Sequence, residues 1–137
     1  MRTLVPAGVL LLSVLYGCGG GPNTPTPPSL AGRWDGTIAS PTDAGGPITL
    51  QLTQTGSSVG GTIRLVQNGE DTPGTVTGTV NASSTTLQLT VTYVYSDGCQ
   101  GTWSTTASVT GQEMAGQYSG HNCIREFVGT LHAARSN

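Results

Sequence analysis

The chain has 137 residues, only 9% of them charged, and a formal net charge of −2. It contains no lysine, and its five positive residues, all arginines, are scattered, so no surface that could follow a phosphate backbone is expected and nucleic acid is excluded as a partner. With so few charges, hydroxyl and amide side chains must keep the surface hydrated, a composition that favours strands over helices.

The first residues have the pattern of an export signal. Arg2 and the amino terminus supply a positive end, and Leu4 to Leu15 form an apolar segment of about a dozen residues. Since a membrane span needs roughly 18 to 20 apolar residues, this segment is too short to be one. The small residue Gly17 then directly precedes Cys18.

The signal ends in Leu15-Tyr16-Gly17-Cys18, which resembles the lipobox of bacterial lipoproteins. The resemblance implies that residues 1–17 are a lipoprotein signal peptide, that cleavage falls before Cys18, and that this thiol carries a lipid such as palmitate. It also implies a membrane-anchored lipoprotein of the bacterial cell envelope, on its periplasmic or surface face. The alternative is an ordinary signal peptide followed by an incidental cysteine.

Residues 18–29 follow as a flexible tether, because they are rich in glycine, proline and threonine and have no apolar period. At about 3.1 Å per residue for polyproline-like chain, the tether would hold a domain on the order of 30 Å from the bilayer. Residues 30–137 are enough for one small domain and too few to divide further.

From Leu30 onward, apolar and polar residues alternate with the period of a β-strand rather than that of a helix. Ile48, Leu50 and Leu52, for example, alternate with threonine and glutamine. Turn-forming residues interrupt the alternation at 41–47, 55–58, 68–74, 81–85, 96–98, 111–113 and 120–122. The runs between these breaks predict eight strands.

A glycine recurs inside these runs, followed by a polar residue and then an apolar one. The glycines with inward parity are Gly36, Gly61, Gly78, Gly101, Gly116 and Gly129. A glycine in mid-strand is unfavourable unless the backbone must bend or a neighbouring side chain needs the space. Both needs arise when a small sheet curls into a barrel. We therefore predict an all-β fold, an eight-stranded antiparallel up-and-down β-barrel, in preference to a flat sandwich.

The first predicted strand contains Gly32-Arg33-Trp34, which resembles the Gly-x-Trp of the first strand in lipocalins and related calycin barrels. The resemblance implies that Trp34 closes one end of the barrel. It extends to the strand count, whereas the other lipocalin motifs and the long C-terminal helix are not found. Small barrels of the avidin type are similar in size and in glycine and threonine content, but their ligand-binding aromatic residues cannot be matched. No ligand is transferred from either family.

Cys99 and Cys123 are the two cysteines left after the lipidation site. If the chain turns at 110–113, counting outward along the two strands places Cys99 within one residue of Cys123, given a bulge near Gly120. The bacterial envelope is oxidising, so we predict a disulfide. In the chain-entropy model it would stabilise the domain by roughly 3 kcal/mol.

Few residues point to catalysis or metal binding. His121 lies near Cys123 and Asp97 in the predicted hairpin, but a metal site needs three or four ligands with sulfur that is not already bonded. His132 has outward parity on the last strand. Most of the acids fall in predicted turns, where carboxylates are usually solvated, rather than in a buried pair. We predict no catalytic residue, no metal and no cofactor, and a protein that is not an enzyme.

Most of the aromatic residues have inward parity. They are Trp34, Tyr93, Tyr95, Trp103, Tyr118 and Phe127. A filled core is the preferred interpretation; in the alternative, all of these except Phe127 would contact a ligand at the barrel mouth. Tyr93 and Tyr95 are best placed to border an open mouth, because a phenol near a strand end can keep its hydroxyl hydrated.

Two functions remain open at this stage. The first is a non-catalytic binding module, anchored to the membrane by its N-terminal lipid, that holds a small apolar ligand at its open end or docks an envelope protein on its rim loops. The second is an inhibitor of a periplasmic enzyme or a structural accessory lipoprotein, because small barrel lipoproteins with a disulfide resemble known envelope inhibitors in size and cellular location. A protruding loop at Asn68 to Gly74 would favour the second.

Overall fold

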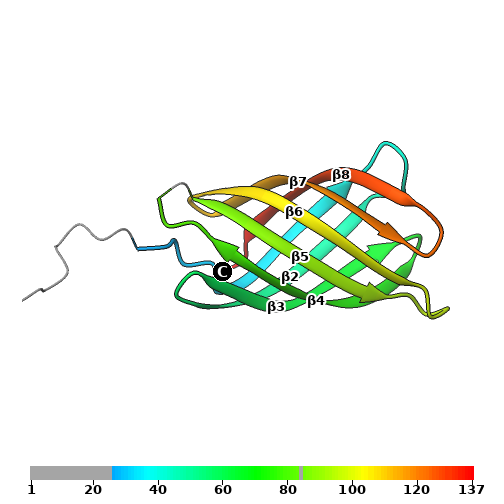
Figure 1. The fold of residues 1–137 in the computed structure, drawn as a ribbon, viewed down its shortest axis with the longest axis horizontal. Helices are drawn as coiled ribbons and strands as arrows, with labels where there is room; N and C mark the ends of the chain where they lie inside the picture. The colour runs from blue at the N-terminus through cyan, green and yellow to red at the C-terminus, as the bar shows by residue number, and fades with distance from the viewer. Residues whose placement is uncertain (1–25, 84) are drawn as a thin grey trace, which may run out of the picture.

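The computed structural model describes residues 26–83 and 85–137 (Figure 1). These residues fold into a closed barrel of eight antiparallel strands in which each strand pairs with the next along the chain and the last pairs with the first. The predicted all-β, up-and-down barrel is therefore confirmed. No helix long and apolar enough to cross a membrane occurs among the described residues. The lipobox and most of the tether lie outside them.

The strands match the predicted period-two runs. They are β1 (Gly32–Ala39), β2 (Gly46–Thr55), β3 (Ser58–Gln67), β4 (Glu70–Val80), β5 (Thr86–Val94), β6 (Gln100–Thr110), β7 (Glu113–Asn122) and β8 (Glu126–Arg135). Along each strand, buried side chains alternate with exposed ones, as β5 illustrates from Leu87 to Val94. The alternation places one face of every strand inside the barrel.

Two predicted breaks are shorter than expected. The segment 68–74 is not a loop, because β4 begins at Glu70 and leaves only Asn68 and Gly69 as a turn. Both turn residues have positive φ, of 51° and 78°, as a tight hairpin turn requires. Pro73 does not end the strand, because the first residues of β4 pair with β3 alone and need no second ladder of hydrogen bonds.

The break at 120–122 is also absent, since β7 continues to Asn122. Its register with β6 runs unbroken from Thr110↔Glu113 to Gly101↔Asn122, so the bulge expected near Gly120 is wrong. The two cysteines are instead one position out of register across the hairpin, with Cα atoms 5.7 Å apart. A diagonal pair of this kind is close enough to bridge without a bulge.

The inward glycines lie where neighbouring strands approach too closely for a side chain. A Cβ on Gly78 would lie 2.0 Å from the carbonyl oxygen of Gln88, and one on Gly36 would lie 1.9 Å from that of His132. A Cβ on Gly101 would instead lie 2.2 Å from Cζ of the Tyr93 ring. Glycine thus permits the tight coiling that closes a small barrel.

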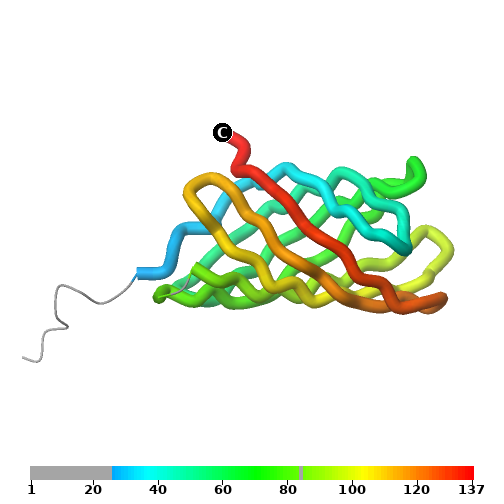
Figure 2. The backbone as a smooth tube through the Cα atoms, turned by 90° about the horizontal axis from the view of Figure 1, so that it is seen from above, coloured from blue at the N-terminus to red at the C-terminus, as the bar shows by residue number. Residues whose placement is uncertain are grey.

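The barrel has two different ends (Figures 1 and 2). We call the tether end the one that holds residues 26–31, the C-terminus and the hairpin turns β2–β3, β4–β5 and β6–β7. We call the far end the one that holds the connections β1–β2, β3–β4, β5–β6 and β7–β8. Because strand direction alternates in an up-and-down barrel, every second connection lies at the same end.

Candidate functional site

The tether end is closed by core side chains. Leu30 and Trp34 are completely buried, and the indole Nε1 of Trp34 donates a hydrogen bond of 2.9 Å to the Leu30 carbonyl. The Leu30 backbone N–H donates to Oε1 of Gln54 at 2.7 Å, and the Arg135 guanidinium lies 4.7 Å from the centre of the Trp34 ring. Trp34 therefore closes one end of the barrel, as its Gly-x-Trp context implied.

A carboxylate network lies on the outer wall near the same end. The Asp35 carboxylate accepts hydrogen bonds from Arg33 at 3.0 Å and from the Thr49 hydroxyl at 2.9 Å, and it also accepts one from the Ser136 hydroxyl. The bond from Arg33, followed by those from Ser136 and Thr49, lowers the pKa of Asp35 to about 2. These contacts join β1, β2 and the C-terminal segment.

A row of aromatic rings occupies the interior toward the far end. Ring centres lie 5.1 Å apart for Tyr93 and Tyr95, 5.9 Å for Tyr93 and Trp103, 4.9 Å for Trp103 and Tyr118, and 6.1 Å for Tyr118 and Phe127. All are buried except Tyr95, which is half-buried. Burial, with a hydrogen bond to Tyr95, raises the pKa of Tyr93 well above its usual range, and burial also raises the pKa of Tyr118.

The structure thus brings together four of the five predicted barrel-mouth residues and separates the fifth. Tyr93, Tyr95, Trp103 and Tyr118 belong to the aromatic row, whereas Trp34 lies at the opposite end. Inward parity is the same for all five, and parity carries no information about position along the barrel axis. The direction of each strand supplies that information.

Two buried polar atoms in this interior have no hydrogen-bond partner among the described residues. They are Nε1 of Trp103 and the hydroxyl oxygen of Thr105, which lie two residues apart on β6 and face the same side of the strand. Buried polar groups normally have partners. These two atoms are therefore unsatisfied polar groups within a mostly apolar interior.

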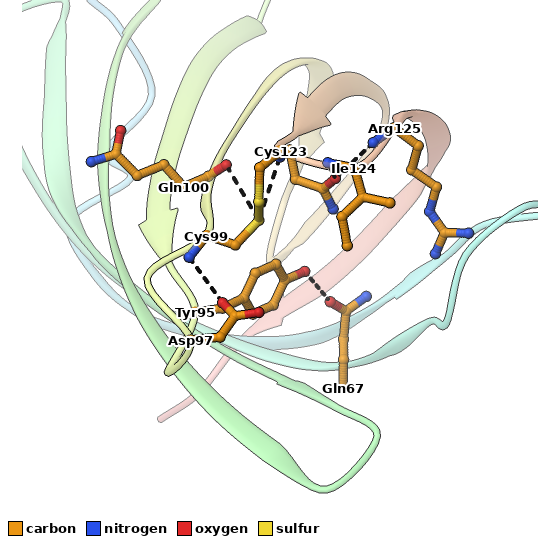
Figure 3. The surroundings of a disulfide bond; sticks show 9 residues. Gln67, Tyr95, Asp97, Cys99, Gln100, Cys123, Ile124 and Arg125 are labelled. Atoms are coloured by element: carbon orange, nitrogen blue, oxygen red, sulfur yellow. Dashed lines mark hydrogen bonds between the residues drawn. A yellow bond between two sulfur atoms is a disulfide. The ribbon is translucent and has the colours of Figure 1, made fainter.

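The disulfide joins two neighbouring connections at the far end (Figure 3). Cys99 closes the β5–β6 connection, where its backbone N–H donates to the Asp97 carboxylate at 2.9 Å. Cys123 opens the β7–β8 connection, in which the Asn122 side-chain oxygen accepts hydrogen bonds from the backbone N–H groups of Ile124 at 2.9 Å and Arg125 at 3.0 Å. The predicted Cys99–Cys123 bond is confirmed, and it supports a short loop with a defined backbone.

The β1–β2 connection, residues 40–45, is tied to its neighbours across the far end. Arg125 forms an ion pair with Asp43, whose side chain is only 15% exposed. The Gln67 side-chain amide donates to the carbonyl of Ala44, and the Ser40 hydroxyl donates to the carbonyl of Val128 at 2.6 Å. Loops and polar contacts therefore close this end, in contrast to the apolar side chains of the other.

Two hollows among the described residues lie along the outer wall. One of about 580 Å³ crosses β4, β5, β6 and β7, and outward residues such as Pro73, Val94 and His121 line it. We call it the far-end hollow. A second, of about 510 Å³, crosses β6, β7 and β8 and is lined mainly by hydroxyl and amide side chains.

Exposed apolar side chains gather at the far end. Among the described residues, the large apolar side chains that remain exposed are Val66, Val94, Ile124 and Val128, and all four lie in strand segments or connections of that end. Ile124 is 81% exposed at the tip of the loop that the disulfide supports. Isolated exposed apolar residues are common on proteins, but their restriction to one end is a feature of this fold.

Charge is distributed just as unevenly. The described far-end residues include five carboxylates and two guanidinium groups, those of Asp43, Glu70, Asp71, Asp97, Glu126, Arg64 and Arg125. The tether end carries two of each, in Asp35, Glu113, Arg33 and Arg135. The side-chain charge is therefore −3 at the far end and balanced at the other. The inward or outward parity of residues along a strand does not reveal this uneven distribution of charge. It could have been predicted by assigning successive turns to alternate ends of the barrel and counting the charges at each end.

Two of the residues weighed as metal ligands or catalytic groups, Cys123 and Asp97, have structural partners. No cluster of three or more histidine, cysteine or acidic side chains that could hold a metal occurs among the described residues. The sulfur of Cys123 is bonded to Cys99, and the Asp97 carboxylate caps the backbone of the same connection. His132 is exposed on the outer wall, as its parity predicted.

Comparison with known proteins provides no further assignment. No protein-family model matches the chain, and no curated protein matches it significantly. The site must therefore be interpreted from its own geometry.

Proposed function

We propose that this protein is a lipid-anchored, non-catalytic binding protein of the bacterial envelope that docks another envelope protein on its far end. The observation that carries the proposal is the exposed Ile124 at the tip of a disulfide-supported loop, on the end opposite residues 26–31. An anchor at the tether end would leave that loop pointing away from the membrane. Inhibition of an envelope enzyme is one form that such docking could take.

A fixed loop is suited to this role. The Cys99–Cys123 bond and the Asn122 side chain hold the backbone around Ile124 before any partner binds. A preorganised loop loses less conformational entropy on binding than a flexible one. A protruding loop at Asn68 to Gly74, which would have favoured an inhibitor or accessory role, is absent because β4 begins at Glu70.

Site-specific cross-linking tests the docking proposal. A photoreactive amino acid at position 124, in protein anchored in its own membrane, should yield a discrete adduct of higher mass, whereas the same group at Thr79, exposed near the tether end, should not. Purified wild-type protein added in excess should compete with the adduct, and an Ile124→Asp variant should compete poorly. Failure to form a competable adduct from position 124 would contradict docking.

The anchor itself is tested separately. Growth with a fatty-acid analogue should label the wild-type protein and not a Cys18→Ala variant. Labelling of Cys18→Ala would exclude this cysteine as the lipidation site and residues 1–17 as a lipoprotein signal peptide.

A small ligand inside the barrel is the second candidate. The unpartnered Nε1 of Trp103 and hydroxyl of Thr105 favour it, because a ligand with a hydrogen-bond acceptor could pair with them beside the aromatic row. The nearly complete burial of the surrounding rings favours docking instead. Native mass spectrometry of protein purified from its own membrane should show an added mass if this candidate is correct and the bare protein mass if it is not.

A further inference from the structure

The far-end hollow contains apolar surface and lies at the acidic end of the barrel. Val94, which is 49% exposed, and Pro73 provide apolar surface within a hollow of about 580 Å³. Glu70 begins β4 just before Pro73, and Asp97 lies in the connection that follows Val94. Glu126 faces His121, another lining residue, across the β7–β8 pair. None of these three carboxylates lines the hollow itself, but each lies at the same end of the barrel, near a lining residue in the chain or across a strand pair.

These three carboxylates have no cationic partner among the described residues. The two far-end guanidinium groups are already engaged, Arg64 with Asp71 and Arg125 with Asp43. Glu70 accepts a hydrogen bond from the Ser96 backbone N–H at 2.9 Å, which fixes its position without neutralising its charge. The far end thus combines an apolar hollow with uncompensated negative charge nearby.

Arginine and lysine side chains are complementary to such a surface. Their aliphatic stems cover apolar area while their charged heads remain in polar surroundings. A stem lying on Val94 and Pro73 would place its head at the end of the barrel that carries Glu70, Asp97 and Glu126. An acidic or neutral segment would instead cover carboxylates without pairing them, which is unfavourable.

We propose that the far-end hollow binds a segment of the partner protein in which arginine or lysine alternates with apolar residues. This inference rests on the docking function proposed above and specifies the chemistry of the partner. Opposite charge at the rim of an interface also accelerates association and selects among partners. An arginine- or lysine-bearing partner would therefore be recruited at the end of the barrel that faces away from the membrane anchor.

Fluorescence anisotropy with defined peptides tests the proposal on the purified full chain. Three short capped peptides serve as probes, one alternating lysine with leucine, one alternating glutamate with leucine, and one alternating lysine with glycine. The lysine and leucine peptide should bind most tightly, and its affinity should fall between about 0.05 M and about 0.5 M salt, where exposed charges become screened. Equal binding of the glutamate and leucine peptide would overturn the proposal.

Matched variants locate the binding surface. Replacing Glu70, Asp97 and Glu126 together by their amides should weaken binding of the lysine and leucine peptide by about tenfold, as expected for three exposed charge pairs. Glu113→Gln, at the tether end, is the control and should leave affinity unchanged. Val94→Ser should also weaken binding, whereas Val128→Ser, equally exposed on β8 and outside the far-end hollow, should not.

The two proposals fail in different ways. Suppose that position 124 forms an adduct that purified protein competes away, but the three peptides bind equally well. Docking at the Ile124 loop would then stand, and an arginine- or lysine-bearing segment would be excluded as its target. Absence of that adduct would exclude docking at the Ile124 loop whatever the peptides do. Unchanged peptide affinity in the amide variant would show that the peptides bind elsewhere, and the far-end hollow would then be excluded as their site.

Discussion

The two ends of the barrel are closed by different kinds of interaction. At the tether end, Leu30 and Trp34 complete the apolar core, and Arg135 covers the indole. At the far end, connections are held over the aromatic row by the Cys99–Cys123 bond and by polar contacts between loops. The first arrangement removes apolar surface from water; the second restrains the chain while leaving apolar and acidic groups exposed.

If the far end docks a partner as proposed, this difference separates stability from recognition within a small domain. Burial of large side chains is the main favourable term in folding, so the tether end contributes to holding the barrel together. A disulfide stabilises a connection without requiring that its side chains be buried, so the loop bearing Ile124 can stay exposed. The far end is therefore free to present the residues that a partner would contact.

The largest effect is expected at the tether end, from Trp34→Ala. Removal of a fully buried tryptophan should lower the free energy of unfolding by about 4 kcal/mol, because it creates a cavity and leaves the Leu30 carbonyl without its donor. Urea titration followed by the fluorescence of Trp103 would measure it. A loss below about 1 kcal/mol would mean that apolar closure of this end is not what stabilises the barrel.

Removal of the disulfide should have the next largest effect. Replacing Cys99 and Cys123 together by serine should lower the free energy of unfolding by about 3 kcal/mol, since the bond closes a loop whose ends are 24 residues apart. Hydrogen exchange should accelerate first in the β5–β6 and β7–β8 connections, where the bond restrains the chain. Uniform acceleration at both ends would contradict the separation of roles.

Alanine at two inward glycines compares the ends directly. Gly78→Ala should cost about 2 to 3 kcal/mol, because its Cβ would meet the rigid carbonyl of Gln88. Gly101→Ala, toward the far end, should cost roughly 1 kcal/mol less, because the obstacle is the Tyr93 ring, which can shift more easily than backbone. The surface change Thr79→Val should stay within about 0.5 kcal/mol as a control in the same denaturant titrations.

The smallest effect is expected on stability at acidic pH, through the hydrogen bonds of the Asp35 carboxylate. The folded-state pKa of about 2 lies below that of an unfolded aspartate, so the stabilisation from this carboxylate is complete above the unfolded value and is lost as pH falls toward 2. Asp35→Asn should therefore make stability less dependent on pH in this acidic range. Melting temperatures of wild type and variant should converge as the pH falls; a constant difference would exclude the network as the cause.

Local sequence was sufficient for the architecture of this protein. Strict alternation assigns every side chain to one face, and inward glycines such as Gly78 indicate that the strands must coil tightly. Hairpin counting placed Cys99 beside Cys123 because register in a hairpin depends on the turn alone. These features depend on neighbours in the chain or on the adjacent strand, which is why sequence determined them.

Tertiary structure decided where the residues lie along the barrel axis and what covers them. Trp34 and Tyr93 have the same inward parity, yet one completes the core of the tether end and the other lies beneath the connections of the far end. Pro73 could remain within β4 only because the first residues of β4 lie outside its pairing with β5 and pair with β3 alone. The exposure of Ile124 and the excess of acidic residues at its end depend on the closed barrel, which brings alternate connections together. Closure is a result of long-range strand pairing, and the alternation of residues along one strand carries no information about it.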